Sequence, residues 1–560
     1  MTQRASDLSY LRTPKCAGEK HMDYRISGIY NRCVTIELNN EDSFHTKAPV
    51  SVSINGEKIY DTDRNVIYLD GLTPDTTYVV EINGKKQTFK TKSETVLLDV
   101  CDFGAAGDGV HDDTAAVQAA ISACPAGGTV YIPAGKYRCT PIFLKSRITV
   151  YIDTGAEILG ETDREKYPKL PGMVTCQDEV HEISFASWEG NPLTSYASLF
   201  TAIDAKDIDI IGRGTINGNA NNGDWWKYPK VKRGAWRPNT FFAVRCSHIR
   251  MAGVTVMNSP AWTIHPYYSD RLEFCCISIK NPADSPNTDG IDPESCSNVL
   301  ISGTVIDVGD DCIAIKSGKY YMAKYHHKPS SEIVVRNCLF KNGHGAVTIG
   351  SEIAGGVNHV KVTQCVFEGT DRGVRIKTRR GRGKESVLDD LKFDHIVMND
   401  IPMPVTVNMF YFCDPDGHSK YVQDKKSHEV DDMTPSIGKI SISDTVCHGV
   451  DASLLCVEGL PEMPVEAIEL KGISADFIHC GKRVDMTPVM MDQFEPISGI
   501  PIFAENVKQL TVDDVSVTGE ELNEDVLAGI ADSSFKDYTV RNRRKNGTKN
   551  SSISQGCKEL

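Results

Sequence analysis

Two adjacent carboxylates, Asp310 and Asp311, stand between two short β-branched runs in the segment VIDVGDDCIAIK, which covers residues 305–316. These runs predict a strand on each side of the pair. Like charges at close range repel, and the repulsion raises the pKa of at least one carboxyl group. A protonated acid beside an ionised base is what cleavage of a glycosidic bond requires. The ordinary alternative is that the pair lies in a solvated turn with no catalytic role. The strands and repeats around the pair distinguish the two alternatives.

The segment around these aspartates belongs to a repeat. Residues 298–316, 332–350 and 359–377 align without a gap, with apolar residues at the same places in each. Residues 271–279 match the first strand of the unit, and residues 290–292 match its second strand after a longer turn. Units this short cannot bury their apolar faces alone and must stack. The pattern therefore predicts a parallel β-helix whose coils lie about 4.8 Å apart.

The alignment also predicts which polar side chains share a column on the folded surface. Asp289 falls in the column of Asp311, and Asp310 shares a column with His344. Each residue alone has an ordinary explanation, since a histidine near glycines is usually a turn residue. Convergence of all four on one face favours a catalytic cleft over these separate explanations.

Arg375 and Lys377 add positive charge to this face. They alternate with Val374 and Ile376, so the apolar pair should point inward and the basic pair outward. Six of the ten residues from 375 to 384 are basic, although the net charge of the chain is −14. A guanidinium fork and an ammonium group both suit a carboxylate. We therefore expect an anionic sugar, bound in a groove with carboxylates at one end and cations at the other, over roughly 14 Å.

The rest of the chain divides into two regions with different sequence patterns, and both patterns predict an all-β protein. Residues 23–94 alternate with the period of strands and predict a small β-sandwich, whereas residues 95–545 carry short strands, turns and almost no helix. One amphipathic helix follows the aspartates at 112–113, either of which could cap it, and it would cover the open end of the solenoid. Residues 1–22 form an extension, and residues 546–560 form a polar, disordered tail.

Composition and charge exclude several classes of protein. The chain is 40% hydrophobic with a mean hydropathy of −0.28, and it has no run of about 18 apolar residues to cross a membrane. A net charge of −14 and a pI near 5.6 disfavour nucleic acid and anionic membranes as partners. The 18 cysteines are dispersed, and several lie in strand-like runs, which predicts reduced and buried thiols rather than a disulfide framework.

The N-terminal residues MTQRASDLSYLRTPKC lack the apolar core of a secretory signal. If Met1 is the native start, we expect a cytoplasmic enzyme. If a signal peptide has been removed, the same sequence would belong to a periplasmic or secreted enzyme.

Five segments resemble, in order, the signature motifs of glycoside hydrolase family 28, the polygalacturonases. Members of that family are right-handed parallel β-helices that hydrolyse α-1,4-linked galacturonate with inversion. The resemblance therefore implies this fold, this reaction, a galacturonan substrate and no cofactor or metal. The segments are NSPAWTIHP (258–266), SPNTDGIDPESC (285–296), GDDCIAIKSG (309–318), NGHGAVTIGSE (342–352) and RGVRIKTRRGRG (372–383).

The resemblance assigns catalytic roles position by position. Asp310 resembles the general acid of the family. Asp289 and Asp311 resemble the pair that activates water, and His344 resembles the histidine that tunes or orients the acid.

The resemblance also assigns substrate contacts. Arg375 and Lys377 form the paired RIK motif that resembles the grip on a galacturonate carboxylate. Core packing explains Trp236 as well as sugar stacking does, and it explains Tyr411 somewhat better. The further expected substrate contacts are Asn287, His265, Tyr411 and Trp236.

The N-terminal region refines the expected activity. The segment YLDGLTPDTTYVVEI places Leu72, Pro74 and Tyr78 as in the tyrosine corner of a fibronectin type III domain. Such a module followed by a family 28 domain resembles bacterial exopolygalacturonases. Loops 160–200 and 217–240 are candidates for closing one end of the groove. We therefore expect exo action.

Three alternatives remain open at this stage. The enzyme could be an endo-polygalacturonase or another family 28 pectin hydrolase. It could be a pectate lyase, because clustered carboxylates could bind calcium. It could also be a solenoid that binds galacturonan without cleaving it.

Overall fold

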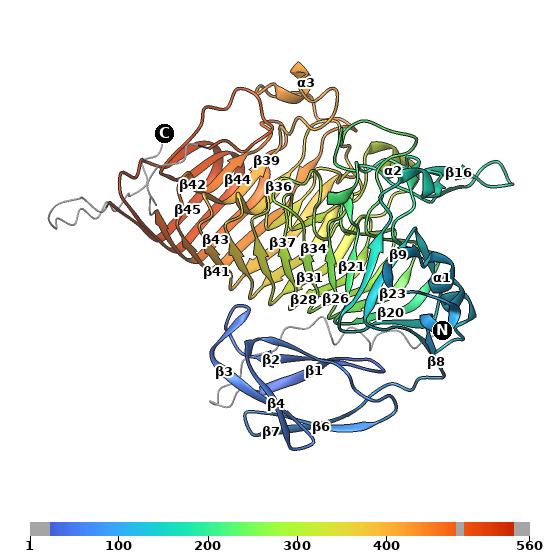
Figure 1. Ribbon diagram of the computed structural model, residues 1–560. Coiled ribbons are helices and arrows are strands. Elements are labelled where there is room, and N and C mark those ends of the chain that lie inside the picture. The colour runs from blue at the N-terminus through green and yellow to red at the C-terminus, as the bar shows by residue number, and fades with distance from the viewer. Residues whose placement is uncertain (1–22, 478–485, 543–560) are drawn as a thin grey trace, which may run out of the picture.

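Seven strands near the N-terminus form a β-sandwich in the computed structural model, which describes residues 23–477 and 486–542 (Figure 1). Apolar side chains of a three-stranded and a four-stranded sheet share its core. The hydroxyl of Tyr78 accepts the backbone N–H of Thr73 at 2.9 Å, as a tyrosine corner requires. The strands are β1 (Asp23–Ile29), β2 (Val34–Asn39) and β5 (Val66–Leu69), and β4 (Glu57–Arg64), β3 (His45–Ile54), β6 (Thr77–Ile82) and β7 (Lys85–Lys90).

From β8 onward the chain winds as a parallel β-helix, as its repeats predict (Figure 1). Each strand pairs in parallel with the equivalent strand of the next coil, and the strands form three columns. The predicted extension 1–22 and the tail 546–560 lie outside the described residues. The first column contains β8 (Leu97–Asp99), β10 (Gly128–Ile132), β13 (Ile148–Ile152), β20 (Lys206–Gly212), β23 (Ser247–Ala252), β26 (Asp270–Cys275), β28 (Ser297–Ser302), β31 (Ser330–Arg336), β34 (Val357–Thr363) and β37 (Val387–Asp394).

The other two columns and the last coils complete the solenoid. The second column contains β9 (Asp108–Asp112), β11 (Gly135–Cys139), β14 (Ala156–Gly160), β21 (Thr215–Asn217), β24 (Thr255–Met257), β27 (Ser278–Lys280), β29 (Val305–Asp307), β32 (Leu339–Lys341), β35 (Val366–Glu368) and β38 (Val397–Asn399). The third contains β12 (Ile142–Leu144), β19 (Phe200–Ile203), β22 (Phe241–Val244), β25 (Ile264–Tyr267), β30 (Ile313–Ile315), β33 (Val347–Ile349), β36 (Arg372–Lys377), β39 (Met403–Asn408) and β42 (Ser453–Glu458). The last coils use β40 (Ser436–Ile437) and the long strands β41 (Lys439–His448), β43 (Val465–Phe477), β44 (Ile500–Gly519) and β45 (Val526–Asn542).

The register of the third column agrees with the alignment of the repeats. Ile313 pairs with Val347, and Val347 pairs with Val374, so β30, β33 and β36 stack in successive coils. Ile291 bridges Ile264 and Ile313 and so carries the column through a coil without a named strand there. These rows point inward and join one continuous apolar core. Burial of each such side chain contributes roughly 1.5–3 kcal/mol.

Helix α1 (Thr114–Ala123) covers the N-terminal end of the solenoid (Figure 1), and its apolar face joins the core. Asp113 is the N-cap residue, but its carboxylate accepts the backbone N–H of Ala106 in the preceding loop. Asp112 accepts the N–H of Thr114 at 3.0 Å. Asp113 therefore stands at the N-cap position without a side-chain cap, and Asp112 bonds the N–H of the first helical residue.

The remaining elements lie in the connections. They matter here because loops after the third column carry two of the short helices, beside the site described below. The elements are α2 (Tyr320–Tyr325), α3 (Lys420–Gln423), the 3-10 helices η2 (Val100–Phe103), η3 (Arg164–Lys166) and η4 (Ala220–Asn222), and the small paired strands β15 (Lys169–Leu170) with β18 (Ser195–Tyr196) and β16 (Met173–Thr175) with β17 (Glu182–Ser184).

The sandwich lies against the outer side of the first column (Figure 1). Arg336 Nε donates to Glu37 Oε1 at 2.6 Å, and both side chains are almost fully buried. The backbone N–H of Gly212 donates to the hydroxyl of Tyr68 at 2.9 Å. Polar groups buried between two bodies stay satisfied only while those bodies keep their relative position. The sandwich is therefore fixed to the solenoid.

Every cysteine in the described ranges 23–477 and 486–542 is a free thiol, and most are buried. This confirms the predicted reduced state for those residues. Within the same ranges, no helix has the length and apolarity that crossing a membrane demands.

Candidate active site

Three aspartates converge in the turns before the third column. Asp310 and Asp311 immediately precede β30, and Asp289 stands one coil earlier. One oxygen from each carboxylate lies within 4.8 Å of one oxygen from each of the others. The backbone N–H of Gly290 donates to the carbonyl of Asp311 at 3.0 Å, so the pairing of adjacent coils sets this spacing. The predicted columns thus bring acids from separate coils to one place.

Two cations from β36 hold Asp311. Lys377 Nζ donates to Asp311 Oδ2 at 2.8 Å, and a terminal nitrogen of Arg375 donates to Oδ1 at 3.1 Å. Burial alone would raise the pKa of Asp311, but Lys377 and Arg375 hold it below its ordinary range and keep the group ionised. The expected separation of acids and cations at two ends of a groove is wrong, because these long side chains reach back across the coil spacing.

Asp289 has the opposite tendency. Its side chain is buried, and burial together with the charge of Asp310 raises the pKa of Asp289 to about 7. Lys316 Nζ lies 3.7 Å from Asp289 Oδ2 and opposes this rise. The trio therefore contains one carboxyl group that holds a proton up to neutral pH and one that stays ionised.

Lys316 lies among buried acids beside the trio. Its ammonium is 3.4 Å from Asp292 Oδ1 and 3.3 Å from Glu352 Oε2, and it is 4.4 Å from the centroid of the Trp262 ring. Burial would lower the pKa of Lys316, but Glu352, Asp292 and Asp289 raise it well above its ordinary value. Burial and the charge of Asp289 raise the pKa of Asp292. Sequence reasoning missed this cluster.

His344 occupies the predicted column with Asp310. Its backbone N–H donates to the carbonyl of Asp310 at 3.1 Å. Its imidazole Nδ1, however, lies 2.8 Å from Asp371 Oδ2, and this contact raises the pKa of His344. Asp371, which sequence reasoning also missed, therefore fixes the orientation of the ring.

These residues line one cleft of about 540 Å³. The predicted contacts Asn287 and Tyr411 both lie in its wall. Glu189 and Lys230 also lie there and form an ion pair with each other. They come from the two loops that were expected to close the groove.

Another segment of the wall was not anticipated. Val489 and Met490 line the cleft, and both have left-handed backbone conformations, with φ of 64° and 55°. The carbonyl of Val489 accepts Asn408 Nδ2 at 3.0 Å, and that of Met490 accepts the N–H of Phe412 at 2.9 Å. A β-branched residue avoids positive φ, so these contacts hold the segment in a strained conformation beside the cleft.

His265 does not reach the cleft. Its side chain has an exposed fraction of 0%, and Nε2 lies 2.8 Å from Glu294 Oε2, which is equally buried. Its ring also packs edge-on against Trp262, with centroids 4.8 Å apart. The expected substrate contact is corrected accordingly: His265 supports the wall from behind.

Trp236 is also absent from the cleft wall. It stacks on Trp188, with ring centroids 4.8 Å apart and planes 6° apart. Trp225 is fully buried and packs edge-on against Tyr167. Trp225 is therefore a core residue, whereas Trp236 is half-buried and packs on Trp188 outside the cleft wall.

The rest of the basic run from 375 to 384 faces other partners. Arg379 binds Asp416, and Arg380 is buried against Glu462. Of this run, only Arg375 and Lys377 line the cleft. The positive charge near the acids is therefore narrower than the sequence indicates.

The three clustered aspartates are also the candidate ligands for a metal ion. In the described part of the chain, it is the one group in which three acidic, cysteine or histidine ligands come close enough to share an ion. Both oxygens of Asp311 already accept hydrogen bonds from Lys377 and Arg375. These fixed cations supply the positive charge that a metal would bring, and the expected absence of a metal stays a prediction.

Comparison with known proteins agrees with this geometry. The family model described as Glycosyl hydrolases family 28 matches residues 145–481, and one described as Rhamnogalacturonase A/epimerase, pectate lyase-like, matches residues 97–157. A "Probable polygalacturonase" of Vitis vinifera is 29% identical over 71% of this chain and 77% of its own. An "Exo-poly-alpha-D-galacturonosidase" of Dickeya chrysanthemi is 24% identical over 68% and 66%. The solved family 28 exopolygalacturonase of Yersinia enterocolitica aligns with a TM-score of 0.58 and 18% identity, over 94% of this chain and 99% of that one.

A right-handed parallel β-helix whose cleft holds three clustered carboxylates beside fixed cations, together with these relatives, identifies the chain as a glycoside hydrolase. The chain belongs to glycosyl hydrolase family 28, because the family model matches more than half of its residues. This confirms the resemblance that the five motifs carry.

Proposed function

We propose that the protein hydrolyses α-1,4-galacturonosidic bonds in polygalacturonate or oligogalacturonides, and that it acts from a chain end. The observation that carries the proposal is the contact of Lys377 and Arg375 with Asp311 inside the cleft. It sets buried positive charge beside the acids that cleave the bond. Arg375 has five N–H donors and uses one of them on Asp311, so the others remain for a uronate carboxylate. A neutral sugar would leave these donors without a partner.

The environments of the three acids support distinct roles. Asp310 is half-buried and, within the described residues, forms no ion pair; its carboxylate accepts the backbone N–H of Asp311 at 2.9 Å. It lines the cleft with no cation of the described residues bound to it, and we assign it the transfer of a proton to the leaving oxygen. Asp311, held ionised by two cations, and Asp289 activate the attacking water.

The proposed function also assigns roles to the domains. Residues 95–545 form the catalytic domain, and residues 23–94 form a fibronectin type III-like module.

The stereochemical outcome tests how water is placed. Acid and base carboxyl groups of most inverting glycosidases lie about 6.5–9.5 Å apart, and those of retaining enzymes about 5–5.5 Å apart. Here one oxygen of each carboxylate lies within 4.8 Å of one oxygen of each of the others. We propose inversion, with water held between Asp289 and Asp311 rather than between acid and base. NMR of the first product should show the β-anomer of galacturonate; an initial α-anomer would contradict the scheme.

Exo action is the finer part of the proposal. The exo-acting relative from Dickeya and the wall contributed by Glu189, Lys230, Val489 and Met490 support it, because loops that narrow a groove restrict it to chain ends. An "Endo-polygalacturonase" of Pectobacterium carotovorum subsp. carotovorum, 27% identical over 53% of this chain and 72% of its own, keeps endo action as the second candidate. Products from a galacturonate hexamer followed over time decide between them. Monomer or dimer should appear first; internal fragments would establish endo action.

A further inference from the structure

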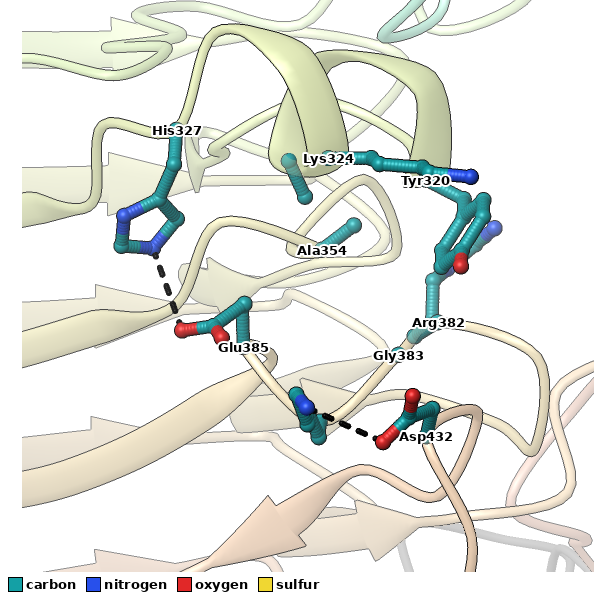
Figure 2. Close-up of a pocket in the computed structure, with 10 residues that line it drawn as sticks. Tyr320, Lys324, His327, Ala354, Arg382, Gly383, Glu385 and Asp432 are labelled. Atoms are coloured by element: carbon teal, nitrogen blue, oxygen red, sulfur yellow. Dashed lines mark hydrogen bonds and ion pairs between the residues drawn. The ribbon is translucent and has the colours of Figure 1, made fainter.

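A second hollow lies beside α2, apart from the catalytic cleft (Figure 2). It encloses about 390 Å³ and shares no lining residue with the cleft. Its walls come from α2 and from loops after the third column. The lining residues on which the argument depends are Tyr320, Lys324, His327, Gly383, Lys384 and Asp432.

One wall is an aromatic platform. The ring of Tyr320 is 37% exposed and stands over Gly383, where a Cβ atom would lie 3.1 Å from the ring (Figure 2). Gly383 also has a left-handed backbone, with φ of +99°, so any other residue there would be strained and would displace the ring. A half-exposed tyrosine ring offers an apolar face and a polar edge, which together suit a sugar.

Positive charge lies next to this platform. Lys324 Nζ lies between two rings, 5.9 Å from the centroid of Tyr320 and 5.2 Å from that of Tyr325, and Lys324 has no carboxylate partner among the described residues. Lys384 pairs with Asp432 at 3.0 Å, but both side chains are more than half exposed. An exposed pair of this kind is worth about 1 kcal/mol or less, so an incoming carboxylate can replace Asp432. One ammonium group thus lies beside the ring, and a second, weakly paired one lies elsewhere in the lining of the hollow.

The sequence around α2 explains this charge. Residues 316–328 read KSGKYYMAKYHHK, which holds four lysines and two histidines and no acid, in a chain of net charge −14. Lys316 and Lys319 are paired with the acids Glu352 and Asp414, so Lys324 is the lysine of this segment that lines the hollow. Tyr321 and His326 on the other side of α2 bind Glu182 at 2.8 and 3.1 Å. The helix is therefore fixed on that side and presents Tyr320 and Lys324 to the hollow.

The hollow and the cleft share a wall. Arg382 lines the hollow, and its Nε donates to the carbonyl of Ser351, which lines the cleft, at 2.7 Å. A polymer whose end occupies the cleft therefore has this hollow within reach of its remaining residues.

We propose that the hollow is a second, non-catalytic binding site for a uronate residue of the polymer, with Tyr320 stacking on the sugar, Lys324 binding its carboxylate and Lys384 adding positive charge to the lining. The proposal rests on the proposed function, since it assumes the same acidic substrate. Its role is to hold a long chain near the cleft, so it should matter for polymer and not for substrates that fill the cleft alone.

The test compares Lys324→Glu and Tyr320→Leu with the wild type on polygalacturonate and on trigalacturonate. Lys280 at the end of β27 is exposed and lines neither the hollow nor the cleft, so Lys280→Glu is the matched control for added negative charge. For Lys324→Glu, kcat/KM on the polymer should fall about fivefold, the scale of one exposed charge contact, while kcat/KM on the trimer should stay unchanged. The fall should shrink at high salt, because exposed charges are screened.

Two results would overturn the proposal. Polymer kinetics of Lys324→Glu equal to those of Lys280→Glu would show that the hollow binds no substrate. An equal fall on trimer and polymer would show that the substitution disturbs the cleft instead. Calorimetric titration of polygalacturonate into Asp310→Asn and into Asp310→Asn/Lys324→Glu measures binding without turnover: a weaker second site in the double variant supports the proposal. Wild-type enzyme that releases no reducing sugar would refute the proposed function, and this titration would still judge the hollow.

Discussion

Lys377 Nζ lies 2.8 Å from Asp311 Oδ2, although a whole coil separates the strands that carry the two residues. One ammonium group therefore has two duties in the proposed reaction. It keeps the base ionised, and it offers donors to the acidic sugar. Variants at this position should affect both binding and pH dependence.

Lys377→Met should raise KM for trigalacturonate by roughly tenfold, because one buried charged contact to the uronate is lost. It should also raise the pKa of Asp311, whose ionised form Lys377 stabilises. The acidic limb of the kcat/KM profile should then move to higher pH. Initial rates between about pH 4 and 8 measure both effects. An unchanged KM would count against the carboxylate role, and Lys280→Met controls for loss of a lysine.

Asp310→Asn should lower kcat by roughly 10²–10⁴-fold, the usual contribution of a general acid. Substrate affinity should change little, because Arg375 and Lys377 remain in place. Calorimetry with trigalacturonate and reducing-sugar assays separate the two quantities. Asp307→Asn, on the preceding strand, is the matched control. Rates like those of the wild type in Asp310→Asn would end the assignment.

Lys316→Met should move the acidic limb of kcat/KM to higher pH. Lys316 lowers the pKa of Asp289 from 3.7 Å away, and without it the carboxyl group would hold its proton more tightly. The base form would then require a higher pH. A purely structural role for Lys316 would lower kcat/KM equally at every pH. An unchanged shape of the pH profile would therefore refute the effect of Lys316 on the pKa of Asp289.

Asp289→Asn should alter how stability depends on pH. The folded pKa of about 7 lies above the ordinary value of 3.8, so the folded state holds a proton that the unfolded chain releases. This stabilisation is full below pH 3.8 and is lost as the pH rises to about 7, at about 1.4 kcal/mol for each unit of difference. In Asp289→Asn, the free energy of unfolding should decline less over this window. Urea titrations at several pH values measure it, and an equal decline would contradict the raised pKa.

Glu37→Ala should lower the free energy of unfolding by about 3–5 kcal/mol, because it removes the buried carboxylate that pairs with both Arg336 and Arg25. The exposed Glu57 of the same sandwich gives the control Glu57→Ala. Denaturant unfolding should show the difference, while kcat/KM on trigalacturonate stays near the wild-type value. Equal stability of the two variants would mean that the sandwich does not brace the solenoid.

The solenoid and the core of the site were predictable because stacking converts sequence alignment into spatial position. Asp289, Asp311 and His344 meet where their columns require, since a parallel ladder admits one register once its apolar rows are aligned. The same alignment places Lys316 in the column of Lys377, so the sequence carried a signal for Lys316 that was not used. Asp371 lay one coil beyond His344 and could have been found in the same way.

The loop residues of the cleft and the burial of His265 could not be predicted from the repeat. Glu189, Lys230, Val489 and Met490 come from loops between coils, where no periodicity fixes the path of the chain. His265 aligns with a motif of the family, but burial against Glu294 removes it from the cleft.

The connections between coils vary in length, yet the strands on either side keep their pairing: β28 meets β31 without a register shift although α2 is inserted between them. The stacked core therefore tolerates loops of different length and sequence between its strands. A change in the length or charge of one loop can therefore alter where a polymer binds, while the arrangement of the catalytic residues stays the same.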